Sequence, residues 1–580
     1  MKQEVILKQA PYGEASFEAL RELGYAYVDK TPYIAVLEKY NTRFPFIIRP
    51  RRFGKSLFAN MLMAYYDKAA KPEFKKNFEG TWIGEHPTPL ASQFLVLKFD
   101  FSGIDDGDNL IQNFIENVKS GLRKFRTRYL QGDSEMEALL EASYASPAVL
   151  LSRALDLIEN RFKEKIYLVI DEYDQFAQGI LSDDPDQFRE ITSRQGFLKN
   201  FYTILKTQFQ SVIGRAFITG VTSISLDSMT SGFNVATNIT NVPNFAGMIG
   251  FTDEELRKLI PQVIDLNHCP VPADKIFSRM KELYDGYRFS TKSNVTVFNS
   301  SMCLYYLDYL SKNFEEPDVL LDPSFTPDLS KIEGILSLGS RNFVEKVVKD
   351  VLFDKPTRLE TTLSSVINLQ ATDKLSDEDV LTVLVFMGFL TFAPNDKNRL
   401  ICPNQAVKEQ FFRFWFQRIC RFKNPYLPAE DLKSAEKCLT AGNIRPLLDF
   451  VSAMLGRSAG AHIHAHLNET AIQLAALMAM STSDTYQATA EEEALGAGFT
   501  DLVLRPREEH PEATGWLIEF KYVKAGKADA KGEAAVAEKL DEAVAQLERY
   551  SAAENIAAIP NLHRAAAVFA GTELRALKTF

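Results

Sequence analysis

Short apolar runs alternate with longer stretches of helical periodicity along the N-terminal part of the chain. The apolar runs cover residues 46–48, 94–101, 166–170 and 215–221. Residues 109–129 and 148–162 lie between them, and their period predicts helices. Uninterrupted apolar runs are typical of strands that are covered on both faces of a sheet. The alternation therefore predicts a parallel sheet in an α/β fold.

The first apolar run leads into a basic turn, the tripeptide GKS and a helical pattern. Residues 46–62 read FIIRPRRFGKSLFANML, in which Leu57, Met61 and Leu62 share one helical face. Strand, GKS turn and helix form the phosphate-binding unit of P-loop NTPases. In that unit the lysine reaches the β- and γ-phosphates and the hydroxyl ligates Mg²⁺. We therefore expect ATP to be bound by Arg52, Phe53, Gly54, Lys55, Ser56 and Leu57, with Ser56 also a metal ligand.

The third apolar run ends in a cluster of acidic residues, which includes Asp171 and Glu172. The carboxyl ends of strands are where α/β sheets place catalytic groups. In P-loop ATPases an aspartate at this position holds Mg²⁺ through water, and its glutamate neighbour polarises the attacking water. An acidic loop after a buried strand is the alternative. With GKS upstream, we expect Asp171 to serve the metal and Glu172 to be the catalytic base.

Polar residues at the end of the fourth run are candidates for sensing the γ-phosphate. The candidates are Thr219, Thr222 and Ser223, and the sequence does not separate them. Further on, Thr252 and Glu255 have the spacing of a capping box at the start of a helix. Arg288 follows this helical region. It either reaches the γ-phosphate from a helical lid or is a surface arginine.

The region 301–444 is mostly helical by pattern. Residues 376–387 predict a helix, and residues 388–404 predict a hairpin that turns at Asn395 and Asp396. A helix followed by such a hairpin suggests a winged helix, which either contacts DNA or serves as a packing surface. The aromatic run at residues 408–422 favours core or interdomain packing over base stacking.

The composition becomes alanine-rich from about residue 445. Asp501 starts one predicted strand, and Glu519 and Lys521 lie on the next, where a spacing of two puts them on one face. Two such carboxylates bind Mg²⁺, with Mn²⁺ as an alternative, and the lysine orients or activates a water for phosphodiester attack. Supplementary acidic residues are Glu469 and one of Glu492 and Glu493.

Several motifs occur in an order that resembles one bacterial family. They are VDKTPYI, FIIRPRRFGKSLFANML, YLVIDEYDQF, FITGVTSIS, GFTDEEL and LYDGYRF. Together they resemble the AAA-ATPase-like proteins that are joined to a PD-(D/E)XK nuclease-like domain, and the D…E-x-K residues resemble that second domain. The GxxxxGK[ST] pattern has glycine where this chain has Arg49. The RPRRFGKS loop is, however, the form of the motif in that family.

The resemblance implies an ASCE-type P-loop core, with the acidic pair on a strand that does not follow the P-loop directly. The expected architecture is an AAA-ATPase-like domain at 1–250, a helical lid at 251–300, a helical or winged-helix region at 301–444 and a PD-(D/E)XK nuclease-like α/β domain at 445–580.

Composition and charge narrow the function classes. The chain has 580 residues, 46% hydrophobic and 24% charged, with a net charge of −10, which does not indicate general nucleic-acid binding. Residues 451–580 carry 12 Lys and Arg against 18 Asp and Glu. The five cysteines include no C-x-x-C pair, which argues against a zinc site and fits a reducing cytosol. The apolar stretch 471–480 is too short to span a bilayer, and we expect a cytoplasmic protein without a membrane partner.

These observations favour an ATPase whose nucleotide state controls a Mg²⁺-dependent, nuclease-like domain that acts on DNA or RNA. The alternative is a nucleotide-regulated sensor or interaction protein with a non-cleaving nuclease fold. Asp501, Glu519 and Lys521 favour the enzyme, whereas the acidic balance favours the sensor. The identity of the nucleic acid and homo-oligomerisation stay open.

Overall fold

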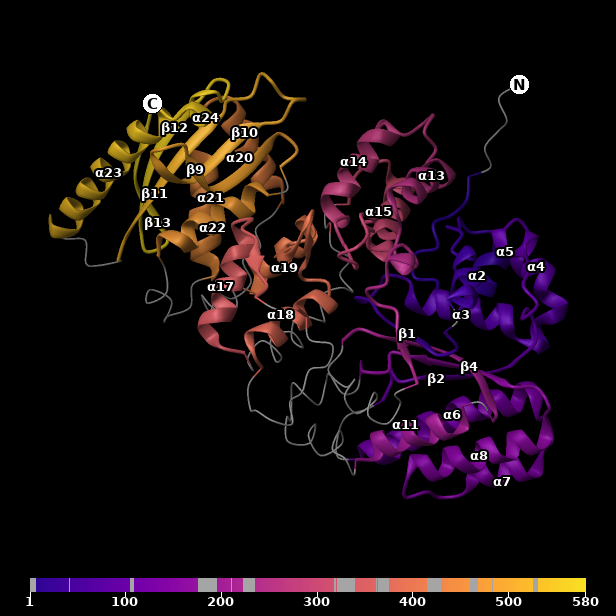
Figure 1. Ribbon diagram of the computed structural model, residues 1–580. Coiled ribbons are helices and arrows are strands. Elements are labelled where there is room, and N and C mark those ends of the chain that lie inside the picture. The colour runs from indigo at the N-terminus through magenta and orange to yellow at the C-terminus, as the bar shows by residue number, and fades with distance from the viewer. Residues whose placement is uncertain are drawn as a thin grey trace. The chain divides into compact units, whose positions relative to one another are not determined.

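The computed structural model describes most of the chain and divides it into two compact units (Figure 1). The described residues are 7–40, 42–104, 109–175, 196–209, 211–222, 235–317, 320, 339–360, 362–363, 375–414, 429–458, 468–481, 483–524 and 530–580. The first unit comprises Met1–Val344 and Pro356–Asn404, and the second comprises Glu345–Lys355 and Gln405–Phe580.

The first unit contains a five-stranded parallel sheet in the order β2-β3-β4-β1-β5. Its strands are β1 (Pro45–Ile48), β2 (Leu95–Asp100), β3 (Ile166–Asp171), β4 (Ile213–Gly220) and β5 (Thr237–Asn238). β4 separates β1 from β3, so the GKS turn and the acidic pair follow strands that are not neighbours. Because the strands are parallel, both groups lie at the same edge of the sheet. The predicted α/β core is confirmed.

Helices cover both faces of this sheet (Figure 1). One face carries α6 (Leu110–Tyr129), α7 (Ser134–Glu141), α8 (Pro147–Arg161) and α11 (Phe197–Gln208). The other carries α2 (Pro32–Lys39), α3 (Lys55–Tyr66), α4 (Phe74–Phe78) and α5 (Trp82–Glu85), and α1 (Phe17–Glu22) packs on α3. Short 3₁₀ turns occupy Lys68–Glu73 and Pro243–Phe245. All six residues of β3 are buried, as expected for a strand covered on both faces.

Three further helices of the first unit lie together as a group: α13 (Asp253–Val263), α14 (Ala273–Tyr284) and α15 (Ser300–Asn313). The capping box is present, because the Thr252 hydroxyl accepts from the Glu255 N–H and the Glu255 carboxylate accepts from the Thr252 N–H. Lys30 ties this group to the region before α2, since its ammonium donates to the Gly247 carbonyl and to both Glu255 carboxylate oxygens at 2.7–2.8 Å.

The predicted helix and hairpin of the middle region are also confirmed. They are α18 (Asp377–Phe386), β7 (Thr391–Ala393) and β8 (Asp396–Ile401), and β6 (Thr357–Arg358) completes a small antiparallel sheet. Asn395 adopts a left-handed φ of 61° at the turn. Gly388, between α18 and β7, packs against the Pro50 ring, where an added Cβ would come within 2.7 Å of Cγ. The segment between α18 and the hairpin therefore contacts the phosphate-binding turn directly.

The second unit is built on a mixed sheet in the order β13-β12-β11-β10-β9, in which only β11 and β12 are parallel. Its strands are β9 (Tyr486–Ala494), β10 (Gly498–Pro506), β11 (Trp516–Val523), β12 (His563–Ala570) and β13 (Glu573–Thr579). Its helices are α17 (Arg341–Leu352, which begins in the first unit), α19 (Gln405–Phe414), α20 (Ala429–Thr440), α21 (Arg445–Ser458), α22 (Glu469–Met480), α23 (Ala530–Ser551) and α24 (Glu554–Ala557).

Several predictions need correction or lie outside the described residues. Asp501 does not start its strand, because β10 begins at Gly498. Thr31 and Pro32 have the sequence pattern of an N-cap and a first-turn proline, but the Thr31 hydroxyl accepts from the Ile83 N–H and does not cap α2. Ser223 lies outside the described residues, and so does the part of the aromatic run that follows α19, residues 415–422. Within the described residues, no helix is both long enough and apolar enough to cross a membrane.

Candidate functional site

The turn between β1 and α3 is shaped by two residues with positive φ, Arg52 at 65° and Gly54 at 93°. The Arg52 carbonyl accepts from the Ser301 N–H, and the Phe53 carbonyl accepts from the Gly250 N–H, both at 3.1 Å. Helix α3 then begins at Lys55, with Gly54 as its N-cap and no side chain capping it. The first N–H groups of α3 are therefore available to an anion.

Arg49, which stands at the usual glycine position, has a structural role in this turn. Its side chain is fully buried and donates to the carbonyls of Ile48 and Thr240 at 2.9 Å and of Phe245 at 3.2 Å. The guanidinium also lies 4.1 Å from the Phe289 ring centroid. The arginine thus joins the end of β1 to the segment after β5, which accounts for its presence in place of glycine.

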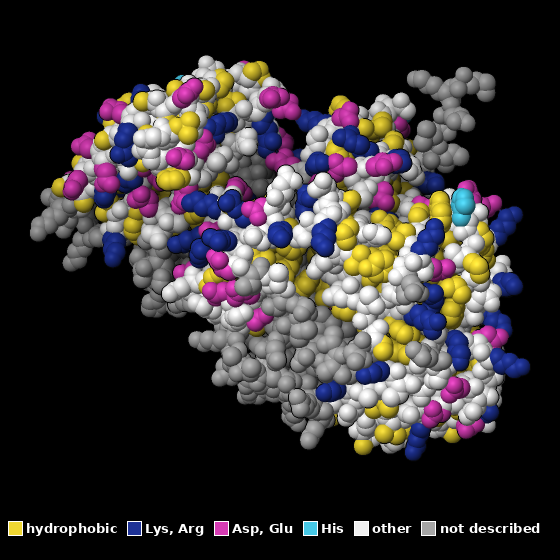
Figure 2. Space-filling view, in the orientation of Figure 1, with side chains coloured by type: hydrophobic (Ala, Val, Ile, Leu, Met, Phe, Trp, Pro, Cys, Tyr) yellow, Lys and Arg dark blue, Asp and Glu magenta, His cyan; other side chains and the backbone are white. Residues whose placement is uncertain are grey.

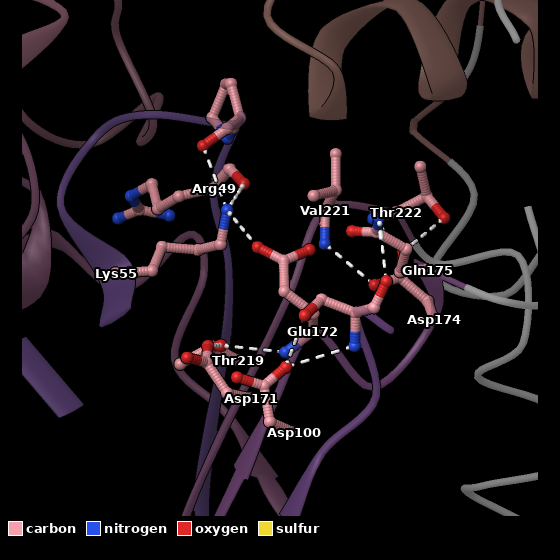
Figure 3. A network of polar contacts seen from close by, with 12 residues as sticks. Arg49, Lys55, Asp100, Asp171, Glu172, Asp174, Gln175, Thr219, Val221 and Thr222 are labelled. Atoms are coloured by element: carbon pink, nitrogen blue, oxygen red, sulfur yellow. Dashed lines mark hydrogen bonds and ion pairs between the residues drawn. The ribbon is translucent and has the colours of Figure 1, made fainter. Parts of the chain in front are cut away.

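Lys55 and Glu172 meet at the carboxyl edge of the sheet (Figure 3). The Lys55 ammonium lies 3.3 Å from Glu172 Oε1 and donates to the carbonyls of Arg49 and Pro50 at 3.1 Å each. The Lys55 side chain is 3% exposed and that of Glu172 15%. A buried lysine is thereby held between the phosphate-binding turn and the acidic pair, although these lie far apart in the sequence.

Glu172 is held in an unusual environment. Its φ of 54° is rare for a residue other than glycine, and such strain clusters at functional sites. Its Oε2 atom is buried and has no hydrogen-bond partner among the described residues. Burial raises the pKa of this carboxyl group, and the nearby Lys55 charge opposes that rise. A carboxylate with a raised pKa and an unsatisfied oxygen has the properties of a general base.

Threonines of β4 and of the loop after it hold the other two acids in place. The Thr219 hydroxyl donates to Asp171 Oδ1 at 2.5 Å, and the Lys98 ammonium lies 3.6 Å from Asp171 Oδ2. Thr222 donates to Asp174 Oδ2 through its N–H at 2.6 Å and its hydroxyl at 2.7 Å. Both threonines are therefore attached to acidic side chains at the sheet edge.

A cavity of about 450 Å³ adjoins the phosphate-binding turn. Its lining includes Tyr12, Tyr27, Lys55, Glu172 and Ile249. This volume lies within the range of small-molecule sites, which are mostly apolar with a few polar groups at one end. The cavity is thus able to hold an apolar ring system with its anionic part toward Lys55 and α3.

The second unit brings a separate polar group together on β10, β11 and α22. The Lys521 ammonium lies 3.1 Å from Glu519 Oε1 and 3.0 Å from Glu469 Oε1. The Phe520 N–H donates to Asp501 Oδ2 at 2.7 Å. Asp501 is thus bonded to the backbone of β11 between Glu519 and Lys521, and α22 supplies Glu469 from its first turn.

The electrostatics of this group fit a divalent cation. Burial raises the pKa of Glu519 to about 8, with the Asp501 charge adding to the rise, and burial raises the pKa of Asp501 to about 6. Glu519 Oε2 is buried, and no residue in the described part of the chain forms a hydrogen bond with it. Two buried carboxylates with raised pKa values are most readily both ionised beside a cation. Among the described residues, however, no three His, Cys, Asp or Glu side chains form a preformed metal cluster.

Known proteins resemble both parts of the chain. Residues 11–230 match the family described as "Predicted AAA-ATPase", and residues 467–578 match the PD-(D/E)XK nuclease superfamily. The chain joins an AAA-ATPase-like region to a nuclease-like region. The expected combination of the two is therefore confirmed.

Two individual proteins are also similar. One is an uncharacterized protein from the vnfD 5′ region of Azotobacter chroococcum mcd 1, which is 25% identical over 341 residues. That match covers 56% of this chain and 58% of the relative, so the chain spans a little over half of the relative's length. The other is the structure of a Walker-type ATPase of Pyrococcus abyssi, with 12% identity and a TM-score of 0.38 over 66% of this chain and 96% of that one.

In the AAA-ATPase-like region, the structure brings together most of the predicted residues. Residues 52–57 line the cavity, and Glu172 lines it with them. Arg288 is placed elsewhere, because its guanidinium donates to the Ser293 carbonyl and to Asn294 Oδ1. Lys98, which sequence reasoning missed, lies on β2 two residues before Asp100. Its position beside Asp171 followed only from the pairing of β2 with β3.

In the nuclease-like region, the structure does not bring Glu492 to the group around Glu519. The Glu492 carboxylate pairs with Arg505 at 2.6 Å and accepts from Asn555 of α24. Glu491 is the nearer acid, since its charge contributes to the raised pKa of Asp501. The register supports this placement, because the pairs on either side of it put Glu491 opposite Asp501. Neighbouring residues of a strand project to opposite faces, so Glu491 and Glu492 do not share a site.

Proposed function

We propose that this protein binds and hydrolyses ATP, and that its nucleotide state controls a Mg²⁺-dependent nuclease-like site acting on nucleic acid. The observation that carries the first half is the 3.3 Å approach of Lys55 to Glu172 across β1, β4 and β3, beside a cavity of suitable size. The second half rests on the carboxylates and lysine of β10 and β11. It also rests on the similarity of both regions to known families.

Each residue of the first site has a role that its position supports. Lys55 and the first N–H groups of α3 hold the β- and γ-phosphates, and the Ser56 hydroxyl and Asp171 hold Mg²⁺. A bound Mg²⁺ neutralises phosphate charge during transfer. Glu172 accepts the proton of the attacking water. Its ion pair with Lys55 must loosen first, because phosphate oxygens compete for the same ammonium.

The residues of the second site suit phosphodiester hydrolysis. Asp501 and Glu519 would hold the cation, which polarises the phosphate and lowers the pKa of a bound water. Lys521 orients that water or the phosphate from its position between Glu519 and Glu469. The Phe520 N–H fixes Oδ2 of Asp501, and Oδ1 would be the oxygen that meets the cation. Glu491 adds negative charge beside Asp501.

Chain connectivity supports control of one site by the other. The chain passes between the two units after Val344, Lys355 and Asn404. Pro403 lies one residue before Asn404 and packs on Gly286, where an added Cβ would meet the Pro403 carbonyl oxygen at 2.1 Å. The Asn404 amide donates to the Asp285 carbonyl at 2.7 Å. Tyr287, the residue after Gly286, packs on Phe53 of the phosphate-binding turn with 4.7 Å between ring centroids. A movement of that turn thus has a short route to the point where the chain enters the second unit.

Lys55→Ala is expected to weaken ATP binding about 10- to 150-fold, because hydrogen bonds to a charged group contribute about 1.5–3 kcal/mol. Calorimetric titration of the full chain with ATP measures this effect, and circular dichroism checks the fold. Lys68→Ala is the matched control, since Lys68 is half-exposed and pairs with Glu164 away from the cavity. Equal affinities for the two variants would contradict the assignment of Lys55.

Metal binding in the second unit is expected to tighten with rising pH. The pKa of Glu519 is about 8, so below that value a proton competes with the cation and must be released on binding. The affinity for Mn²⁺ should rise about tenfold per pH unit from pH 6 to pH 8 and then level off. Titrations at several pH values measure this dependence, with Asp501→Asn as the variant that lacks the site. An affinity that is flat across this interval would contradict the site.

One observation favours the alternative, a nucleotide-regulated sensor that does not cleave. Residues 451–580 have a net charge of −6, whereas neutralising phosphates normally supplies much of the affinity for nucleic acid. On the face shown in Figure 2, acidic and basic side chains of the second unit are interspersed. In the sensor, the group around Glu519 would bind a cation and regulate a partner, and no phosphodiester would be cut.

A further inference from the structure

The first turn-proximal residues of β10 include an exposed aromatic side chain, Phe499, near the nuclease-like site. Phe499 is 59% exposed, although it is a large apolar residue on a strand of the sheet. It lies two residues before Asp501 on β10, a spacing of about 7 Å along an extended strand. Its exposure is not explained by packing, because β10 buries its apolar side chains only further along, from Leu502 to Leu504.

The ammonium group of Lys355 lies next to the Phe499 ring. The Lys355 ammonium lies 5.8 Å from the Phe499 ring centroid and forms an ion pair with Glu491. Glu491 in turn lies opposite Asp501 in the hairpin register, and its charge acts on Asp501. Lys355, Glu491 and Phe499 therefore form a continuous group that ends at the metal-binding acids. The Lys355 side chain is 46% exposed, so a phosphate is able to reach it.

We propose that Phe499 and Lys355 bind an unpaired nucleotide next to the phosphodiester that the second site acts on. The base stacks on the Phe499 ring and a flanking phosphate contacts Lys355, an arrangement that requires single-stranded DNA or RNA because both faces of a base inside a duplex are covered by the neighbouring base pairs. This inference rests on the proposed nuclease-like function and names its substrate class. It also explains how a domain with a net negative charge would bind nucleic acid, since base stacking supplies affinity that does not depend on neutralising phosphates.

The test compares variants of the full chain in binding to fluorescein-labelled oligo-dT, oligo-rU and blunt DNA and RNA duplexes of equal length. Fluorescence anisotropy is measured with Ca²⁺ present. Phe499→Ala is expected to weaken single-strand binding about 5- to 150-fold, and Phe499→Trp is expected to keep it, because stacking needs an aromatic face. Lys355→Gln should reduce the slope of log affinity against log salt concentration by about the amount that one phosphate contact contributes. The two single-stranded probes distinguish DNA from RNA.

Leu495→Ala is the matched control, because Leu495 is 58% exposed in the same hairpin and has no ring. It should leave binding unchanged. Equal binding by Phe499→Ala and the parent chain, or full rescue by Phe499→Leu, would overturn the stacking platform while leaving the proposed function standing. A change of oligomeric state in Phe499→Ala without a change in binding would assign the ring to self-association instead. A parent chain that binds none of the probes would overturn the nuclease-like function together with this inference.

Discussion

Glu172→Gln is expected to bind ATP and to hydrolyse it about 10²- to 10⁴-fold more slowly than the parent chain, the range that a positioned general base contributes. Glutamine keeps the size of the side chain and a hydrogen-bond acceptor for Lys55, which lies 3.3 Å away. It does not accept the proton of the attacking water. Binding requires no base, so only the hydrolysis step should slow. Phosphate release under saturating ATP measures this rate.

The control for this variant is Glu164→Gln, which changes an acid that pairs with Lys68 and lies at the amino end of β3. It should hydrolyse ATP at the parent rate. If Glu172→Gln also does so while its fold and ATP affinity are intact, Glu172 is only an acid at the end of a strand. The strain of its backbone would then need another explanation.

Asp501→Asn is expected to abolish metal-dependent cleavage, with a loss of at least about a hundredfold, because the charge stabilisation by a catalytic metal is worth several kcal/mol. Asparagine keeps an oxygen for the Phe520 N–H, so the local fold should persist. ATP hydrolysis should be unchanged, since that site lies in the other unit. Cleavage of a labelled oligonucleotide and phosphate release, measured on the same preparation, report the two activities.

Asp541→Asn serves as the comparison, because Asp541 is an exposed acid on α23 of the same unit. It should cleave like the parent chain. A loss of ATP hydrolysis in Asp501→Asn that equals its loss of cleavage would show that the variant disturbs the whole chain. Undiminished cleavage by a folded Asp501→Asn would remove Asp501 from the metal site.

Much of the first site was predictable from the sequence, for a physical reason. Lys55 follows one apolar strand and Glu172 follows another, and parallel strands bring their carboxyl ends to one edge whatever their order. Arg288 was not predictable in this way, because its position depends on the reach of a long side chain. Its guanidinium donates hydrogen bonds to Ser293 and Asn294, which lie only a few residues further along the chain.

In the second site, too, some residues were predictable from the sequence and others were not. Glu519 and Lys521 were predictable from strand alternation, since they are two residues apart. Asp501 was predictable from its place on the preceding strand and from the D…E-x-K pattern. The choice among Glu491, Glu492 and Glu493 was not, because three consecutive acids give no sign of which face each occupies. That choice depends on the hairpin register with β10 and on the left-handed φ of 47° at Glu491.

The measurement that tests the central claim most directly is cleavage of single-stranded and duplex DNA and RNA by the full chain with Mg²⁺ or Mn²⁺, with and without ATP. We expect metal-dependent cleavage whose rate changes when ATP is added, and a different rate in Glu172→Gln, which holds ATP without turning it over. No cleavage of any substrate under any nucleotide condition, by a chain that binds both ATP and metal, would contradict the nuclease account and favour the sensor.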